Sequence, residues 1–377
     1  MHILIAPNAF KQALDATDAA KALERGFLTS RLSCTCECFP IGDGGNGTGE
    51  LLTRHLDGKM ISASATDPLG RPVTASFGWV EDSQTAVIEM ASASGLHLLA
   101  PRELDPLHSS SYGTGQLMKA ALDLRPRQLI LAVGGSATVD AGCGILTALG
   151  VRFLDAQGNE IIDLPQGLEK LYDVDTSGLD SRMADCRVTV LCDVINPLLG
   201  EQGAAHVFGP QKGATPDTVK RLEAILTHFS TVVQNETEIR LGDLASGGAA
   251  GGVSAGLHAI IGAELVSGID YFLQMTGFDR SLSRSDLVIT AEGSIEEQTL
   301  RGKGPLGVAK RAQSRGIPVI CLAGSIPLTV DETLNHYFDV LLAIGNRPAS
   351  LEEALAETAD NLQRTAVQLG NMLHRFR

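Results

Sequence analysis

Residues 128–149 read QLILAVGGSATVDAGCGILTAL, and this stretch holds the pattern that decides the fold. An apolar run, Gln128–Val133, leads into the glycine turn at 134–136, and a helical pattern follows over Ala141–Leu149. A short apolar run bounded by glycines predicts a buried strand, and strand–turn–helix units are the building blocks of parallel α/β sheets. The stretch therefore predicts an α/β protein.

The same unit recurs near both ends of the chain. At the start, a strand at Ile3–Ala6 precedes a helix over Ala13–Leu28, and a strand at Cys34–Ile41 precedes a helix around Thr48–Leu56. Near the end, the sequence predicts strands at Asp286–Thr290, Pro318–Ala323 and Asp339–Ile344, and a C-terminal helix over Leu351–Leu373.

The middle of the chain departs from this repetition. Dense turn residues at 67–72 precede two runs, Val73–Val80 and Thr85–Met90, that are typical of an antiparallel hairpin. Thr215-Pro216 is a strong helix start, and the Gly/Ala-rich segment Ser246–Gly256 should pack very close to its neighbours.

We therefore predict two α/β domains. Residues 1–65 plus 285–377 would form a discontinuous Rossmann-like domain with a parallel sheet, and residues 66–284 a second, mixed α/β domain inserted into it. The length of 377 residues suits two domains, because single hydrophobic cores stop growing at roughly 250–300 residues.

Composition excludes several classes of partner. The formal net charge of −14 opposes binding to nucleic acid and to anionic membrane surfaces. No run approaches the roughly 20 apolar residues that a membrane-spanning helix needs, and the first residues lack the features of a signal peptide. The seven cysteines, an odd number, favour free thiols in a reducing compartment. We expect a cytoplasmic protein, whose oligomeric state stays open, a homo-oligomer included.

Three cysteines, Cys34, Cys36 and Cys38, alternate along one predicted strand and so share one face. They could form a soft-metal site, but structural zinc sites usually space their cysteines by two to four residues. We expect these side chains to pack against a core instead.

One glycine motif suggests a dinucleotide. Gly42–Gly47 fits the pattern G-x-G-x-x-G between a strand and a helix, and Asp67 lies about twenty residues beyond it. The motif follows the second strand rather than the first, and Asp67 lies in a turn rather than at the end of a strand. NAD binding by an oxidoreductase is therefore kept only as the alternative.

Acids, amides and lysines recur at the ends of predicted strands and in loops. Asp43, Asp193 and Glu292 each follow or end a strand, at the edge where open α/β sheets bind ligands. The turns at 134–136 and 113–115 precede helices and could offer backbone amides to phosphate. Three lysines in loop-like contexts could balance the anion: Lys11, Lys212 and Lys303. Such a set suits phosphoryl transfer, which needs acids for magnesium, a proton acceptor and positive charge.

A run of strings, in order over almost the whole chain, resembles the bacterial glycerate kinase type-1 family. The strings are APNAFK (6–11), DGGNGT (43–48), DPLG (67–70), IEMASASGL (88–96), GGSAT (134–138), CDVINP (192–197), FGPQKGA (208–214) and EG (292–293). The resemblance implies two α/β domains and a kinase that uses ATP and Mg²⁺ to phosphorylate D-glycerate, usually at the 2-hydroxyl. Phosphorylation at the 3-hydroxyl remains an alternative.

We expect the active site in the cleft between the two domains. The expected catalytic residues are Asp193, Lys212 and Lys303, and the expected magnesium ligands are Asp43 and Glu292. The residues expected to bind substrate or phosphate are Lys11, Gly44, Gly45, Gly134, Gly135, Ser136, Asn196 and Gln211. The chain departs from the family pattern at four positions, namely Asn8 for Asp, Asn46 for Glu, Ser294 for Arg and Glu296 for Asp.

Overall fold

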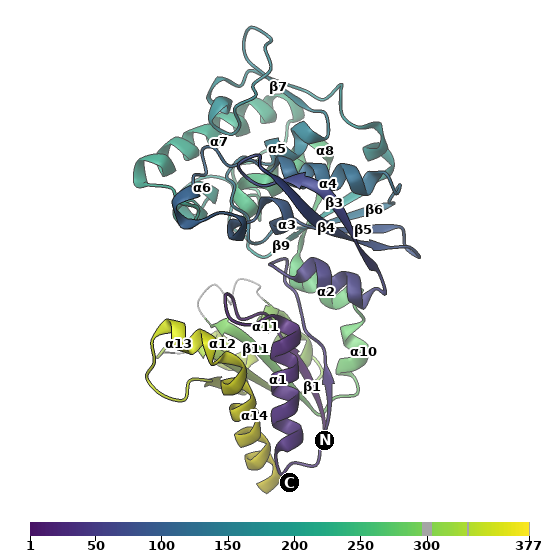
Figure 1. Ribbon diagram of the computed structural model, residues 1–377, viewed down its shortest axis with the longest axis vertical. Coiled ribbons are helices and arrows are strands. Elements are labelled where there is room, and N and C mark those ends of the chain that lie inside the picture. The colour runs from purple at the N-terminus through teal and green to yellow at the C-terminus, as the bar shows by residue number, and fades with distance from the viewer. Residues whose placement is uncertain (296–303, 330–331, 377) are drawn as a thin grey trace. The chain divides into compact units, whose positions relative to one another are not determined.

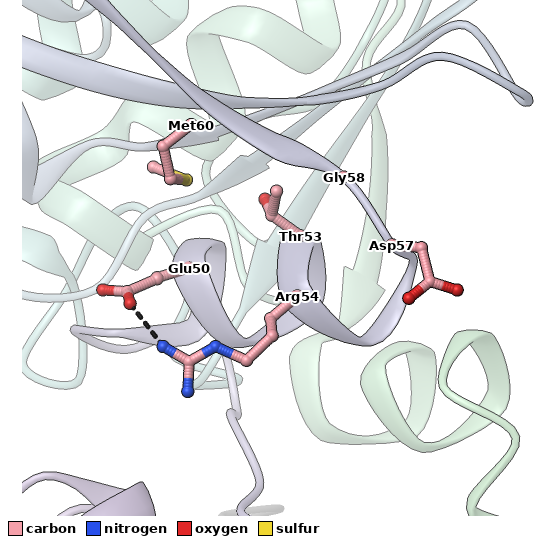
Figure 2. Close-up of a pocket in the computed structure, with 6 residues that line it drawn as sticks. All are labelled: Glu50, Thr53, Arg54, Asp57, Gly58 and Met60. Carbon is pink, nitrogen blue, oxygen red and sulfur yellow. Dashed lines mark hydrogen bonds and ion pairs between the residues drawn. The ribbon is translucent and has the colours of Figure 1, made fainter.

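The computed structural model describes residues 1–295, 304–329 and 332–376 and divides into two compact units (Figure 1). Met1–Asp43 and Ile269–Arg377 form the Rossmann-like unit, and Gly44–Gly268 forms the inserted unit. Both divisions fall earlier in the chain than the boundaries given from the sequence. The first division falls earlier because residues 48–55 form a helix that packs on the sheet of the inserted unit, and residues 59–66 form an edge strand of that sheet.

The Rossmann-like unit is built on a five-stranded parallel sheet, which confirms the predicted architecture. Its strands run in the order β13-β12-β11-β1-β2, and every neighbouring pair is parallel. Their bounds are β1 His2–Pro7, β2 Thr35–Cys38, β11 Leu287–Ser294, β12 Val319–Ser325 and β13 Val340–Ala343. The helices are α1 Ala16–Thr29, α9 Gly268–Met275, α10 Phe278–Leu282, α11 Gly304–Gln313, α12 Glu332–Tyr337, α13 Leu351–Ala356 and α14 Thr358–Arg375.

Helices α1 and α14 pack closely on this sheet. Leu23 and Phe27, one turn apart on α1, are fully buried, and a Cβ on Gly26 would lie 2.4 Å from the carbonyl oxygen of Gln363 on α14. The helix begins later than predicted, because the carboxylate of Asp15 accepts a hydrogen bond from the backbone N–H of Asp18 and caps it. The predicted C-terminal helix is two helices, which meet at Glu357.

The three alternating cysteines pack against this core, as expected. Cys34, Cys36 and Cys38 lie partly buried beside the apolar residues of the Rossmann-like unit. Burial raises the pKa of the Cys36 and Cys38 thiols to about 12, so both stay protonated at neutral pH.

The inserted unit carries a six-stranded mixed sheet in the order β10-β9-β6-β5-β4-β3. Its strands are β3 Lys59–Thr66, β4 Pro72–Val80, β5 Thr85–Glu89, β6 Gln128–Ala132, β9 Arg187–Cys192 and β10 Glu264–Ser267. The predicted hairpin is present, since β4 pairs antiparallel with β5, and β5, β6, β9 and β10 are parallel. Strand β3, absent from the prediction, is an edge strand of mostly small and polar residues that pairs with β4.

Helices and a small second sheet complete the inserted unit. The helices are α2 Thr48–His55, α3 Ala91–Ser94, α4 Tyr112–Leu122, α5 Cys143–Ala148, α6 Ala204–Phe208, α7 Pro216–Thr237 and α8 Val253–Ile261. The small sheet pairs β7 Arg152–Leu154 with β8 Asp173–Asp175. Among the described residues, no helix combines the length and the apolar character needed to cross a membrane.

Local signals explain where two of these helices begin. Thr215 caps α7 with its side chain and Pro216 is the first helical residue, as predicted. Helix α5 begins two residues later than predicted, because Ala141 and Gly142 adopt left-handed backbone conformations with φ of 50° and 75°. The Gly/Ala-rich segment packs as tightly as expected, since a Cβ on Gly256 would lie 1.8 Å from the carbonyl oxygen of Ala141.

Candidate functional site

The parallel strands of the inserted unit bring several of the expected site residues to one edge. The register pairs Glu89 of β5 with Ala132 of β6, and Ala132 with Leu191 of β9, so these strands end at the same level. The glycine turn 134–136 therefore follows β6 beside Asp193, which follows β9. This carboxyl edge is where open α/β sheets bind their ligands.

Lys212 is the most unusual side chain near this edge. It lies in a short 3-10 helix, Pro210–Lys212, and only 2% of its surface is exposed. Its Nζ donates hydrogen bonds to Ser136 Oγ at 2.9 Å and to the carbonyl oxygen of Thr138 at 2.7 Å. Burial lowers its pKa to about 7, while the negative charges of Asp140 and Asp193 act in the opposite direction. The structure thus brings Lys212, Ser136 and Asp193 together.

The turn after Asp193 is held by an amide side chain. Asp193 is half-buried, and Asn196, nearly fully buried, donates from Nδ2 to the carbonyl oxygen of Gln202 at 2.8 Å. The carbonyl oxygen of Asn196 accepts from the N–H of Gly248 at 2.9 Å. Asn196, expected to bind substrate, therefore fixes the turn that carries Asp193. Gln211 lies exposed on the 3-10 helix beside Lys212.

The glycines expected to bind phosphate let two loops pack face to face. The N–H of Gly134 donates to the carbonyl oxygen of Gly44 at 2.8 Å, and a Cβ on Gly134 would lie 2.5 Å from Gly45 Cα. Gly135 has a φ of 72°, and a Cβ there would lie 1.9 Å from Oδ1 of Asn46. These contacts require glycine whether or not a ligand binds, and the N–H of Gly134 is already used within the protein.

Gly134→Ala should lower the stability of the inserted unit. The new methyl group must displace the loop at Gly45, and overpacking of this kind costs about 1–3 kcal/mol in the free energy of unfolding. Gly242→Ala is the matched control, because its Cβ would meet only Leu199 at an ordinary 3.4 Å. Chemical denaturation followed by circular dichroism measures both variants, and equal stabilities would contradict this account of the loop packing.

No pattern in the sequence assigned a role to Glu89. This residue ends β5, and its carboxylate binds the backbone N–H groups at the N-terminus of α2. Its Oε1 accepts from the N–H of Gly47 at 2.8 Å and its Oε2 from the N–H of Gly49 at 3.2 Å. Burial raises the pKa of Glu89 despite these two hydrogen bonds. The dinucleotide fingerprint would place a pyrophosphate at this helix N-terminus. A carboxylate of the protein already binds there.

In the Rossmann-like unit, the strand order identifies the ligand edge. The chain runs from β1 to β2 on one side and from β11 through β12 to β13 on the other, so the order reverses between β1 and β11. Doubly wound sheets bind ligands at such a switch point, outside the carboxyl ends of the strands. Asn8 follows β1 there and donates its N–H to the carbonyl oxygen of Ala291 at 2.8 Å, while Glu292 is buried on β11.

The two acids expected to hold magnesium both lie in this unit. Asp43 is nearly fully buried, and its Oδ2 accepts from Asn8 Nδ2 at 2.9 Å and from the N–H of Gly304, the first residue of α11, at 3.4 Å. Glu292 lies next in the chain to Ala291, the hydrogen-bond partner of Asn8. Lys11 is exposed in the tight turn after β1, whose ends Phe10 and Leu14 form a bridge.

The oxygen donors of Asp43, Glu292 and Asn8 suit magnesium. Within the described residues, no three His, Cys, Asp or Glu side chains form a metal-binding group. Magnesium typically takes only one or two protein carboxylates and completes its shell with phosphate oxygens and water, so this set fits the ion. Lys303 and Glu296 lie outside the described residues.

Comparison with known proteins identifies the family. The profile of the glycerate kinase family matches residues 3–374. The chain belongs to the glycerate kinase family. A glycerate kinase of Bacillus subtilis is 44% identical over 366 residues, which cover 97% of this chain and 96% of that protein. The glycerate 2-kinase of Escherichia coli is 40% identical, with the same coverage of both chains.

A solved structure agrees with this assignment. A crystal structure from Salmonella typhimurium LT2, described as a "putative glycerate kinase 2", is 42% identical and superposes with a TM-score of 0.83. The match covers 100% of this chain and 99% of that one. The resemblance noted in the sequence is confirmed, and the protein is an enzyme of the kinase class.

Proposed function

We propose that this protein phosphorylates D-glycerate at its 2-hydroxyl with ATP as the phosphate donor. The matches to glycerate kinases support the substrate, and the name of the Escherichia coli relative supports the 2-position. The single observation that carries the proposal is the buried Lys212 at the carboxyl edge of the inserted unit's sheet. Its Nζ donates a hydrogen bond to Ser136 and lies within the electrostatic influence of Asp193.

The inserted unit would handle the acceptor. Asp193 would accept the proton of the attacking hydroxyl, since its carboxylate is half-buried at the end of a strand on a turn whose backbone Asn196 fixes. Ser136 would donate a hydrogen bond to glycerate. The ammonium of Lys212 would stabilise the negative charge that develops on the transferred phosphoryl oxygens.

The Rossmann-like unit would bind the nucleotide and the metal. The switch point between β1 and β11 is the expected place for ATP phosphates, and Asp43 and Glu292 would hold the ion there. When bound, magnesium neutralises charge on the phosphate oxygens. Lys11 would contact phosphate from the loop after β1. Lys303, outside the described residues, remains a proposed second source of positive charge.

The alternative of an NAD-dependent oxidoreductase has less support. The glycine-rich stretch would need the N-terminus of α2 for a pyrophosphate, and the carboxylate of Glu89 accepts from the N–H groups of Gly47 and Gly49 there. Asp67, the acid expected at the ribose, is buried and ion-paired with Arg71 in its own turn.

One assay tests the proposed function. Release of ADP by the purified protein should require D-glycerate, ATP and Mg²⁺ together, and omission of any one should abolish it. Two-dimensional ³¹P–¹H NMR of the product then locates the phosphate. A signal coupled to the single C2 proton supports 2-phosphoglycerate, whereas coupling to the two C3 protons would redirect the proposal to the 3-hydroxyl. NAD reduction without ADP release would refute the kinase reaction for this substrate.

Asn8→Asp should make the metal region more dependent on magnesium. It replaces the amide that donates to Asp43 Oδ2 at 2.9 Å with a second carboxylate, as in the family pattern, and two carboxylates this close repel each other. Without Mg²⁺ we expect a melting temperature a few degrees below the wild type, because about 1 kcal/mol shifts it by that much. Added Mg²⁺ should restore it and should saturate turnover at several-fold lower concentration. Identical Mg²⁺ responses of variant and wild type would contradict the assignment of Asp43.

A further inference from the structure

Asp140 is a fully buried acid that the proposed mechanism does not use. Its Oδ2 accepts from Ser111 Oγ at 2.6 Å, from the N–H of Ser111 at 2.8 Å and from the N–H of Gly144 at 3.3 Å. Its Oδ1 accepts from the N–H of Gly142 at 3.1 Å. All four donors are uncharged, so they orient the carboxylate without cancelling its charge.

The same loop binds Lys212. The Nζ of Lys212 donates to Ser136 Oγ and to the carbonyl oxygen of Thr138, and Asp140 is two residues further along this loop. Both of these acceptors are uncharged. A buried ammonium with only neutral partners is costly to keep charged, so the balance depends on acids that act on it through the low-dielectric interior.

Two acids raise the pKa of Lys212 through their negative charge, and they differ in whether substrate can reach them. The electrostatic influence on Lys212 comes from Asp140 and Asp193. Asp193 is half-buried at the strand edge, whereas Asp140 is 0% exposed and saturated with hydrogen bonds inside the protein. Asp193 can therefore take up a substrate proton and lose its charge during the reaction, and Asp140 is sealed from substrate.

We propose that Asp140 is a positioning residue whose negative charge, held inside the protein, balances the buried Lys212 ammonium. This inference rests on the proposed function, in which Lys212 must carry a positive charge when the phosphoryl group is transferred. With Asp140 in place, one of the two negative charges that favour the Lys212 ammonium remains while Asp193 changes protonation state. Without it, the amine becomes neutral at lower pH, and the site loses its cation.

The loop around Asp140 is rigid enough for this role. The N–H of Ala141 donates to the carbonyl oxygen of Gly251 at 3.1 Å, and a Cβ on Gly251 would lie 2.1 Å from the carbonyl oxygen of Thr138. The backbone that links the acid to the acceptors of Lys212 is thus packed against Gly251 both before and after Asp140. Hydrogen bonds hold both charged groups to this loop, Lys212 through Ser136 and Thr138 and Asp140 through Ser111, Gly142 and Gly144.

A titration of the lysine itself tests the proposal in the full-length, ligand-free protein. ¹³C-labelled lysine reports each ammonium through its Cε signal, and the signal missing from Lys212→Met identifies Lys212. We expect it to titrate near pH 7 in the wild type, well below the ordinary lysine value of about 10.4. In Asp140→Asn the midpoint should fall by about one unit or more, a tenfold or larger increase in the acid dissociation constant.

Ser111→Ala is the matched control, because it removes one donor to the same carboxylate but leaves its charge. The Lys212 midpoint should stay at its wild-type value in this variant. A folded Asp140→Asn protein with an unmoved midpoint overturns the proposal. If Asp140→Asn does not fold, Ser111→Ala decides: an unmoved midpoint supports the charge, and a midpoint lowered by a unit overturns it in favour of loop structure.

The titration is independent of the reaction. It contains no glycerate, ATP or magnesium, so it gives the same answer if the enzyme phosphorylates a different hydroxy acid. A failed kinase assay with the expected titration would reject the substrate and leave the role of Asp140 intact. An active kinase whose Lys212 midpoint does not move in Asp140→Asn would reject the role of Asp140 and leave the proposed function intact.

Discussion

Lys212→Met should reduce kcat by about 10²–10³-fold, the usual cost of removing one preorganised group that stabilises charge in a transition state. Methionine fills the same volume without a charge, so the loss would come from chemistry rather than from collapse of the site. Turnover is measured as D-glycerate-dependent ADP release at saturating ATP and Mg²⁺.

Folding should survive this substitution. The variant loses the two hydrogen bonds to Ser136 and Thr138, each worth about 1 kcal/mol, but it no longer buries an ammonium at a cost. The two effects oppose each other, so we expect the free energy of unfolding to change by no more than about 2 kcal/mol. Lys220→Met, at an exposed lysine of α7, is the control and should leave turnover unchanged. A Lys212→Met enzyme with near-normal kcat would remove Lys212 from the mechanism.

The pKa of Lys212 also gives the wild-type enzyme a pH signature. In the free enzyme the protonated fraction falls about tenfold per pH unit above the pKa of about 7, so kcat/KM should decline with unit slope in that range. Bound anionic substrate favours the ammonium, which should move the same decline to higher pH in kcat. In Lys212→Met the residual activity should lack this decline.

Lys212 affects stability in the opposite direction to activity, since it makes the free energy of unfolding rise with pH while kcat/KM declines. Lysine in the unfolded chain keeps its proton up to about pH 10.4, whereas folded Lys212 loses it near pH 7. Between these values the unfolded state binds more protons, so Lys212 makes the free energy of unfolding rise with pH. Lys212 therefore disfavours the folded state most at low pH, where its charge is complete. A group that destabilises the fold in its charged form is better explained by function than by packing.

The sequence was sufficient for the architecture because the strands are short apolar runs between glycine turns. Ile3–Ala6 and the runs near residues 286 and 318 have no polar alternation, which is typical of strands buried on both faces, and they form the parallel sheet. Strand β3 was missed because Lys59–Thr66 is an edge strand of mostly small and polar residues. Its place depends on pairing with β4 rather than on its own propensity.

The site was predictable as a set of residue types and strand ends, but not as contacts. Lys212 and Ser136 are 76 positions apart, and no local pattern indicates that one bonds the other or that Lys212 is buried. Similarly, the glycine-rich stretch matched a dinucleotide motif, yet the acid that meets the N-terminus of α2 is Glu89, 42 positions beyond Gly47. Long-range contacts of this kind follow from the order of the strands, which short sequence patterns do not encode.

Asp193→Asn should reduce kcat by about 10²–10⁴-fold, the range expected for loss of a general base. The amide keeps the shape of the side chain, and its Oδ1 can still accept a hydrogen bond from the substrate hydroxyl, so KM for D-glycerate should change by a few-fold at most. Asp82→Asn, an exposed acid in the turn between β4 and β5, is the matched control. Near-normal turnover of a folded Asp193→Asn enzyme would show that another group accepts the proton.

The pH profile separates Asp193 from Asp140, although both acids act on Lys212. Loss of either charge makes Lys212 deprotonate at lower pH, so both variants should show a displaced alkaline decline in kcat/KM. Below that decline Lys212 is protonated again, and the Asp140→Asn enzyme should recover most of its activity. The Asp193→Asn enzyme should not recover its activity, because lowering the pH protonates Lys212 but does not replace the missing proton acceptor. Recovery of Asp193→Asn at low pH would instead make Asp193 a second counter-charge, with no part in the proton transfer.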